Sequence, residues 1–301
     1  MTRDLTVVFG GSGFVGAAIA RELLAAGRRL RIVAQRPERF LAPGAGADLE
    51  RVAADLRDAD ALRAALAGAT AVVNAVGLYH ERGDLTFQAI HVAGARSLAA
   101  AAREAGLKDL VQLSGIGADR ASKSAYLRAR AEGEAAVRAA FPDAVILRPS
   151  AIYAPDGGLV VDLAAMLRRT TLFPLFGDGS KRLQPVSRGD VAAAATAALA
   201  RPEARGRIFE LGGAKVYSYR ALLELILAAM GRRCLLLPLP YLVWEALAAL
   251  LSPLPNPPLT LAQVLLMRHD NLASPELGGL RDLSITPADL EADLAEMVAR
   301  P

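Results

Sequence analysis

The stretch LTVVFGGSGFVGAAIARELLAAG, residues 5–27, decides the fold. Its first five residues are apolar or β-branched, which predicts a buried parallel strand. Glycines follow at positions 10, 13 and 16, and apolar side chains then recur at helical spacing as far as Gly27, which ends the helix. The stretch therefore predicts a strand, a glycine-lined turn and a helix.

The three glycines suit the diphosphate of a dinucleotide. Gly10 permits a tight turn, Gly13 lets the backbone approach a phosphate, and Gly16 lets the helix lie close to the strand. The start of the helix then presents unpaired N–H groups and partial positive charge to the phosphates. An ordinary turn between strand and helix is the alternative, but three glycines in this position favour a nucleotide site.

The rest of the chain alternates strands with helices. Strands are expected at 30–34, 52–54, 70–76, 110–113, 144–147 and 207–211, with helices that include 58–66, 84–105 and 124–140. This alternation predicts an α/β fold, a Rossmann-type doubly wound parallel sheet that binds ligands at the carboxyl ends of its strands. We expect a Rossmann domain over 1–150 and a smaller mixed substrate or partner lobe over 151–301, with segments near 183–213 returning to the Rossmann core.

The residue after the second strand bears on the choice of cofactor. An acidic residue there would favour NAD, but the sequence has Gln35 followed by Arg36, which can meet a 2′-phosphate. This favours NADP(H), with NAD(H) possible. A merely solvated arginine is the alternative, because 35 basic residues with four lysines leave 31 arginines in the chain.

Two hydroxyl side chains follow the fifth strand at a spacing that suggests proton transfer. Ser114 ends the strand, Tyr126 comes twelve residues later, and Arg130 lies one helical turn beyond Tyr126. In this chemistry the tyrosine exchanges a proton with the substrate oxygen, the serine holds that oxygen, and a lysine four residues after the tyrosine binds the ribose. Arginine keeps the positive charge, but its planar fork is a different shape. Arg130 therefore supports cofactor binding better than turnover.

Composition excludes several other classes of protein. The net charge is +4 with no basic run, so nucleic acid is not an expected partner. The single cysteine, Cys234, cannot form an internal disulfide, and the scattered histidines suggest no metal site. Because a strand is predicted at the start, we expect no signal peptide, and the apolar segment 235–251 is too short to span a bilayer. We expect a cytoplasmic protein, with that segment available for a membrane surface or a partner.

Several segments together resemble a known family. These are VFGGSGFVG (8–16), YLRARAEGEAAVRAAFPDAVILRPSAIYAP (126–155), LQPVSRGDVAAA (183–194) and the tail near 267–291. The chain resembles the atypical extended short-chain dehydrogenases/reductases, and among them the NADPH-binding accessory subunit of respiratory complex I. Arg130 departs from the pattern, because the family generally has lysine there.

The resemblance implies a set of site residues. The expected cofactor contacts are Gly10, Ser12, Gly13, Phe14, Val15, Gly16, Arg36, Asp55, Leu56 and Gly77, with Tyr126 and Arg130 at the ribose and Pro149 and Ile152 near the nicotinamide. Ser114, Tyr126 and Arg130 are the candidate catalytic residues, and no metal is expected.

Two functions follow from the resemblance. In the first, a tightly held NADP(H) has a structural or assembly role related to complex I or quinone metabolism. The protein is then expected to be peripheral on the cytoplasmic face of the inner membrane and docked on a membrane-associated complex. In the second, Ser114 and Tyr126 serve an active NADP(H)-dependent reductase or dehydrogenase, or a sugar-nucleotide epimerase or dehydratase.

Overall fold

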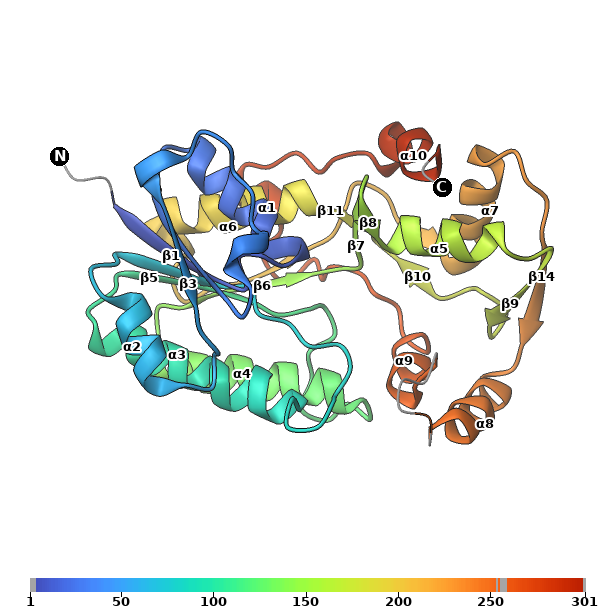
Figure 1. Ribbon diagram of the computed structural model, residues 1–301. Helices are drawn as coiled ribbons and strands as arrows, with labels where there is room; N and C mark the ends of the chain where they lie inside the picture. Colours follow the sequence, from blue (N-terminus) through green and yellow to red (C-terminus); the bar gives the residue numbers. More distant parts are fainter. Residues whose placement is uncertain (1–3, 253, 255–258, 300–301) are drawn as a thin grey trace. The chain divides into compact units, whose positions relative to one another are not determined.

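The computed structural model describes residues 4–252, 254 and 259–299, which fall into two units (Figure 1). The first unit comprises Met1–Pro149, Arg188–Leu211 and Pro275–Ile285. The second comprises Ser150–Ser187, Gly212–Ser274 and Thr286–Pro301. The chain thus returns twice to the first unit, and the sequence does not mark the second return, at 275–285.

The first unit is built on a seven-stranded parallel sheet, which confirms the predicted Rossmann-type fold. Its strand order is β12-β6-β5-β4-β1-β2-β3. The strands are β1 (Leu5–Phe9), β2 (Arg29–Ala34), β3 (Leu49–Ala53), β4 (Ala71–Asn74), β5 (Asp109–Leu113), β6 (Val145–Pro149) and β12 (Ile208–Leu211). The order reverses between β1 and β4, and ligands of open α/β sheets bind at such a point.

Helices cover both faces of this sheet. α1 (Phe14–Ala25) and α6 (Arg188–Ala200) contact each other on one face, and α2 (Ala59–Leu66), α3 (Ala95–Glu104) and α4 (Ala125–Ala140) cover the other (Figure 1). The two central strands, β1 and β4, are apolar apart from Thr6 and Asn74 and are buried along their full length. Burial on both faces explains why these two strands lack the alternation of a half-exposed sheet.

The predicted helix over 84–105 differs from what the structure shows. Regular structure begins only at η3 (Gln88–Gly94), a π-helical segment that continues into α3. α4 lies very close to this segment: a side chain at Gly133 would meet the His91 carbonyl oxygen at 1.9 Å. Only glycine allows that approach, and sequence periodicity does not reveal it.

The second unit has a helical core with short strands around it. α5 (Leu159–Arg168), α7 (Tyr219–Ala229) and α10 (Leu290–Ala299) pack together through buried aliphatic side chains. The strands are β7 (Ile152–Ala154), β8 (Gly157–Gly158), β9 (Leu172–Phe176), β10 (Arg182–Leu183), β11 (Val186–Ser187), β13 (Tyr217–Ser218) and β14 (Leu235–Leu239). After β14 come α8 (Tyr241–Leu251) and α9 (Leu261–Leu266). Among the described residues, no helix is both long enough and apolar enough to cross a membrane.

Candidate nucleotide site

The turn after β1 depends on its glycines. Gly10 has a φ of +73°, and a side chain there would lie 2.8 Å from the Ala75 carbonyl oxygen. A side chain at Gly16 would lie only 2.2 Å from the Gly10 carbonyl oxygen. The turn is therefore closed by backbone packed on backbone, and no other residue fits at these two positions.

The start of α1 leaves room for an anion. Gly13 is exposed, and the Gly10 carbonyl oxygen is the one described atom that lies close to where its side chain would be. Within the described residues no side chain caps this helix, so its first N–H groups face outward. Ser12 and Val15 are half-buried and Phe14 is exposed, with the Arg188 guanidinium 4.6 Å above its ring. An open cradle, free N–H groups and a nearby cation fit a diphosphate.

The residues expected at the adenosine end have different surroundings. Arg36 is exposed directly after β2. Asp55 accepts hydrogen bonds from Arg57 (2.8 Å) and Gln35 (3.2 Å), and the Arg57 bond lowers the pKa of this carboxyl to about 2. Leu56 is buried among core side chains against Gly94, so only its backbone could face a nucleotide.

Ser114 belongs to a buried network of charged groups. Its hydroxyl donates to Glu134 at 2.5 Å, and Arg148 donates two hydrogen bonds to the same carboxylate, at 2.9 and 2.7 Å. Arg148 also pairs with Glu210 at 3.1 Å. The network joins β5, α4, β6 and β12, and both carboxylates are buried. The proton of Ser114 is therefore committed to Glu134.

Tyr126 and Arg130 meet one turn apart on α4, as their spacing predicts. The Arg130 Nε donates to the Tyr126 hydroxyl at 3.2 Å, and another guanidinium nitrogen donates to the Leu113 carbonyl at 3.0 Å. Arg130 also lies beside Gly77, where an added side chain would come within 3.5 Å of the guanidinium. The arginine thus bridges the ends of β4 and β5 and is itself buried.

An aromatic cluster surrounds Tyr126, and the sequence analysis did not identify it. Tyr79 stacks on the Tyr126 ring, with centroids 5.7 Å apart, and the rings of Phe87 and His91 meet its edges. His91 donates from Nε2 to the Leu78 carbonyl at 2.9 Å. Burial, together with the positive charge of Arg130, lowers the pKa of His91 to about 3. The imidazole is therefore neutral at physiological pH.

The structure brings most of the predicted residues to one edge of the sheet. The Pro149 carbonyl accepts from the Ile116 N–H at 3.1 Å, and both this carbonyl and the Tyr126 hydroxyl lie about 4 Å from a side chain added at Gly115. Ile152 belongs to β7 in the second unit.

Glu134, Arg148 and Glu210 are the charged residues that sequence reasoning missed. The sequence feature that could have indicated them is a charged residue within a mostly apolar stretch. Across the described ranges, no three His, Cys, Asp or Glu side chains are grouped to hold a metal.

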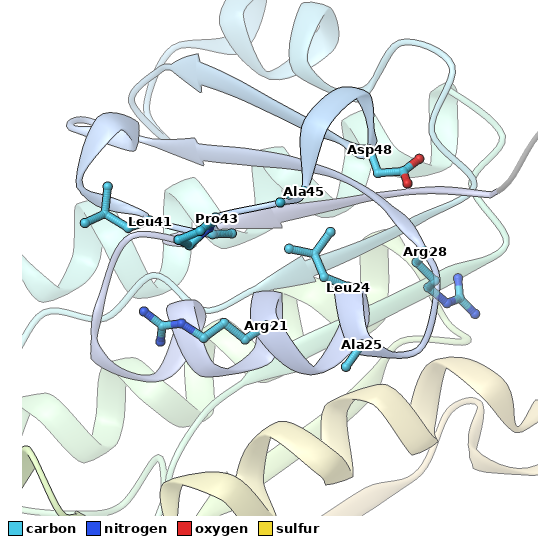
Figure 2. A pocket seen from close by; sticks show the side chains of 10 residues that line it. Arg21, Leu24, Ala25, Arg28, Leu41, Pro43, Ala45 and Asp48 are labelled. Carbon is cyan, nitrogen blue, oxygen red and sulfur yellow. The ribbon is translucent and has the colours of Figure 1, made fainter.

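A separate surface hollow of about 430 Å³ flanks α1, away from the glycine turn. Figure 2 shows it between the C-terminal half of the helix, with Arg21 and Leu24, and the 41–48 connection, with Leu41 and Asp48; Arg28, from the turn after the helix, also lines it. It contains none of the residues expected to bind nucleotide, and we assign it no part in the site.

Comparison with known proteins agrees with this geometry. Residues 10–202 match a family described as NAD(P)H-binding. The mitochondrial NADH dehydrogenase (ubiquinone) 1 alpha subcomplex subunit 9 of Mus musculus is 30% identical over 303 residues, which span 98% of this chain and 80% of that protein. A ceramide reductase of Caulobacter vibrioides is 32% identical over 60% of this chain and 56% of its own length.

A solved structure shows the same fold. The triphenylmethane reductase of a Citrobacter species, crystallised with NADP(H), superposes with a TM-score of 0.75 at 17% identity and covers 98% of this chain and 99% of its own. The glycine turn, the parallel sheet and these matches lead to one assignment: the chain belongs to the NAD(P)H-binding family, and its relatives include subunit 9 of the mitochondrial NADH dehydrogenase (ubiquinone) 1 alpha subcomplex.

Proposed function

We propose that this protein holds NADP(H) as a structural cofactor and acts as a binding or assembly protein rather than as an oxidoreductase. One observation carries the proposal: Ser114, the residue that should hold a substrate oxygen, already donates its proton to Glu134. Arg148 fixes that carboxylate with two hydrogen bonds, so releasing the serine would disturb a buried ion pair. Such an arrangement favours a fixed structure over a serine that turns to each substrate.

The residues around the glycine turn would hold the nucleotide. The start of α1 would bind the diphosphate through Ser12, Gly13, Phe14 and Val15, and Tyr126 with Arg130 would bind the nicotinamide ribose. Arg36 would select NADP(H), because it is exposed at the end of β2 where a 2′-phosphate would lie. Bound there, the nicotinamide can supply or accept a hydride, but the proposed role does not use that chemistry.

The proposed place of action is the cytoplasmic face of a membrane, next to a membrane-associated protein complex. The similarity to a subunit of mitochondrial NADH dehydrogenase supports such a partner. A role in complex I assembly or in quinone metabolism belongs to the same proposal. Nucleic acid has no place in it.

The nucleotide content of the purified protein tests the proposal. We expect near-stoichiometric NADP(H) in the native protein, identified by mass spectrometry after release. Protein stripped of its nucleotide should regain stability when NADPH is added, by about 2.7 kcal/mol when the NADPH concentration is one hundred times the dissociation constant. A protein that purifies empty and gains no stability from NADPH would contradict the proposal. So would steady NADPH oxidation in the presence of a carbonyl substrate.

A second candidate is an active reductase, and one observation favours it. Tyr126 accepts a hydrogen bond from Arg130 and so keeps its own proton available for a carbonyl oxygen. The similarity to a ceramide reductase agrees with an apolar, carbonyl-bearing substrate. In that case Tyr126→Phe should abolish NADPH oxidation while the nucleotide stays bound. Equal rates in the variant and the wild type would exclude this role for Tyr126.

A further inference from the structure

The helix α8 is attached to the second unit through its polar groups. The Tyr241 hydroxyl donates to the Met267 carbonyl at 2.5 Å, and the Trp244 indole N–H donates to the Leu175 carbonyl at 2.8 Å. Glu245 pairs with Arg268 at 2.7 Å. These three residues recur at helical spacing, so they form one face of α8, and that face is turned toward the protein.

The opposite face of α8 is aliphatic and exposed. Leu242 and Leu250 are 74% and 76% exposed, and Val243 and Leu247 lie on the same side of the helix at 48% and 39%. Glu245 is the only charged residue between positions 234 and 267 of the sequence. A surface helix of a water-soluble domain normally has the reverse arrangement, with its apolar stripe inside.

The strand pair next to α8 adds to this surface. β14 and β9 are parallel, with Leu235 opposite Leu172, and both leucines are largely exposed. We use the term leucine face for these two residues together with the four of α8: Leu172, Leu235, Leu242, Val243, Leu247 and Leu250. Exposed aliphatic side chains in this number usually mark an interaction site.

Arginines lie where the two strands begin. The chain enters β14 through Arg232 and Arg233 and enters β9 after Arg168 and Arg169. Because the strands are parallel and start in register, these arginines come from the same end of the pair. Arg168 donates to the Val298 carbonyl, and the other three are exposed. Positive charge therefore stands at the Leu172 and Leu235 end of the leucine face, whereas α8 follows the opposite end of β14.

We propose that the leucine face binds the interface of a phospholipid bilayer that contains anionic lipids. Aliphatic side chains without donors or acceptors match the hydrocarbon of a bilayer. The neighbouring arginines match lipid phosphates, and α8 is too short to span the bilayer, so it lies along the surface. The inference rests on the peripheral location proposed above and names the surface responsible for it.

Vesicle sedimentation tests this inference with the full chain. We expect the protein to sediment with phosphatidylcholine vesicles that contain phosphatidylglycerol and much less with phosphatidylcholine alone, and the difference should shrink at high salt. Leu242→Glu with Leu250→Glu should reduce binding to both kinds of vesicle at least about tenfold. Arg232→Gln with Arg233→Gln should reduce only the preference for anionic lipid, by about fivefold for each arginine. Leu41→Glu changes an equally exposed leucine of the first unit, and it should bind as the wild type does.

Several outcomes would overturn the inference. Wild-type protein that is monodisperse but sediments with neither kind of vesicle would contradict the inference. So would a Leu242→Glu, Leu250→Glu variant that still binds the vesicles as the wild type does. A wild-type dimer that the same double substitution converts to monomer would identify a second copy as the occupant instead. Bound nucleotide, measured in the same samples, separates the two proposals: its retention without lipid binding contradicts only this inference, and its absence with lipid binding contradicts only the structural role of NADP(H).

Discussion

The turn after β1 and the segment after β5 lie at the same edge of one sheet, but their polar groups are in opposite states. At the glycine turn, α1 starts without a side-chain cap and leaves its N–H groups exposed. After β5, the Ser114 hydroxyl and the Arg130 guanidinium are both bonded to other protein groups. The first region is arranged to receive an outside ligand, and the second is largely satisfied by the protein itself. That difference is the physical reason to separate nucleotide binding from turnover.

The largest expected effect is at the glycine turn. Gly16→Val would push a side chain into the Gly10 carbonyl oxygen, so we expect a loss of about 4 kcal/mol or more in the free energy of unfolding, measured by urea denaturation. Gly13→Ala is the matched control, because its side chain would lie 3.2 Å from the same oxygen. It should cost about 1 kcal/mol of stability and still lower NADPH affinity at least about tenfold, because it fills the cradle. A Gly16→Val protein as stable as Gly13→Ala would show that the turn does not need its close packing.

The second largest effect is expected in the buried charged network around Glu134, where the polar groups are bonded to one another. Glu134→Ala leaves Arg148 with one carboxylate partner instead of two, and loss of a partner from a buried pair costs about 3–5 kcal/mol. Combining Glu134→Ala with Arg148→Met should cost less than the sum of the single changes, because each single change already removes the same Glu134–Arg148 pair. Additive losses in a double-mutant cycle would mean that the two side chains do not act as a pair. Ser114→Ala, which removes one hydrogen bond, should cost only about 1 kcal/mol.

The two regions also differ in how far the sequence could predict them. The glycine turn depends on residues within seven positions of one another, and their backbone demands are visible in the residue types. The network of Glu134, Arg148 and Glu210 joins residues up to 76 positions apart, and only the strand order brings them together. The spacing of Tyr126 and Arg130 correctly placed them on one helix face, but it could not show that Leu113 and Gly77 would surround the arginine.

Two further features lay beyond sequence periodicity for the same reason. The π-helical segment Gln88–Gly94 lies where α4 comes close at Gly133, which is a tertiary contact. The apolar character of α8 is plain in the sequence, but which face is exposed depends on hydrogen bonds to Leu175 and Met267. Local patterns thus predict elements and turns, whereas long-range contacts decide which polar groups remain available.

A smaller effect is expected on the pH dependence of stability. His91 has a pKa of about 3 in the fold and about 6.5 when unfolded, so the unfolded chain binds the extra proton between these values. Stability is therefore complete above pH 6.5 and falls as the pH drops toward 3, by at most about 1.4 kcal/mol per pH unit. His91→Gln can still donate to the Leu78 carbonyl. It should remove this pH dependence of the free energy of unfolding, measured by urea denaturation between pH 4 and 6.

Arg130→Gln should raise the pKa of His91, because the nearby positive charge helps to lower it. An unchanged His91 titration by NMR would mean that the arginine does not sit beside the ring.

The smallest expected effect sharpens the description of the open region. Arg36 is exposed, so its contact with a 2′-phosphate would be worth about 1 kcal/mol, and Arg36→Ala should weaken NADPH binding about fivefold while leaving NADH binding unchanged. Arg39→Ala, an exposed arginine three residues later, is the matched control and should change neither affinity. Isothermal titration of both nucleotides into stripped protein gives the four affinities needed. Equal losses for NADPH and NADH would mean that Arg36 attracts any dinucleotide through its charge alone. Selectivity would then have to come from the backbone of the turn after β2, because Asp55 is already bonded to Arg57 and Gln35.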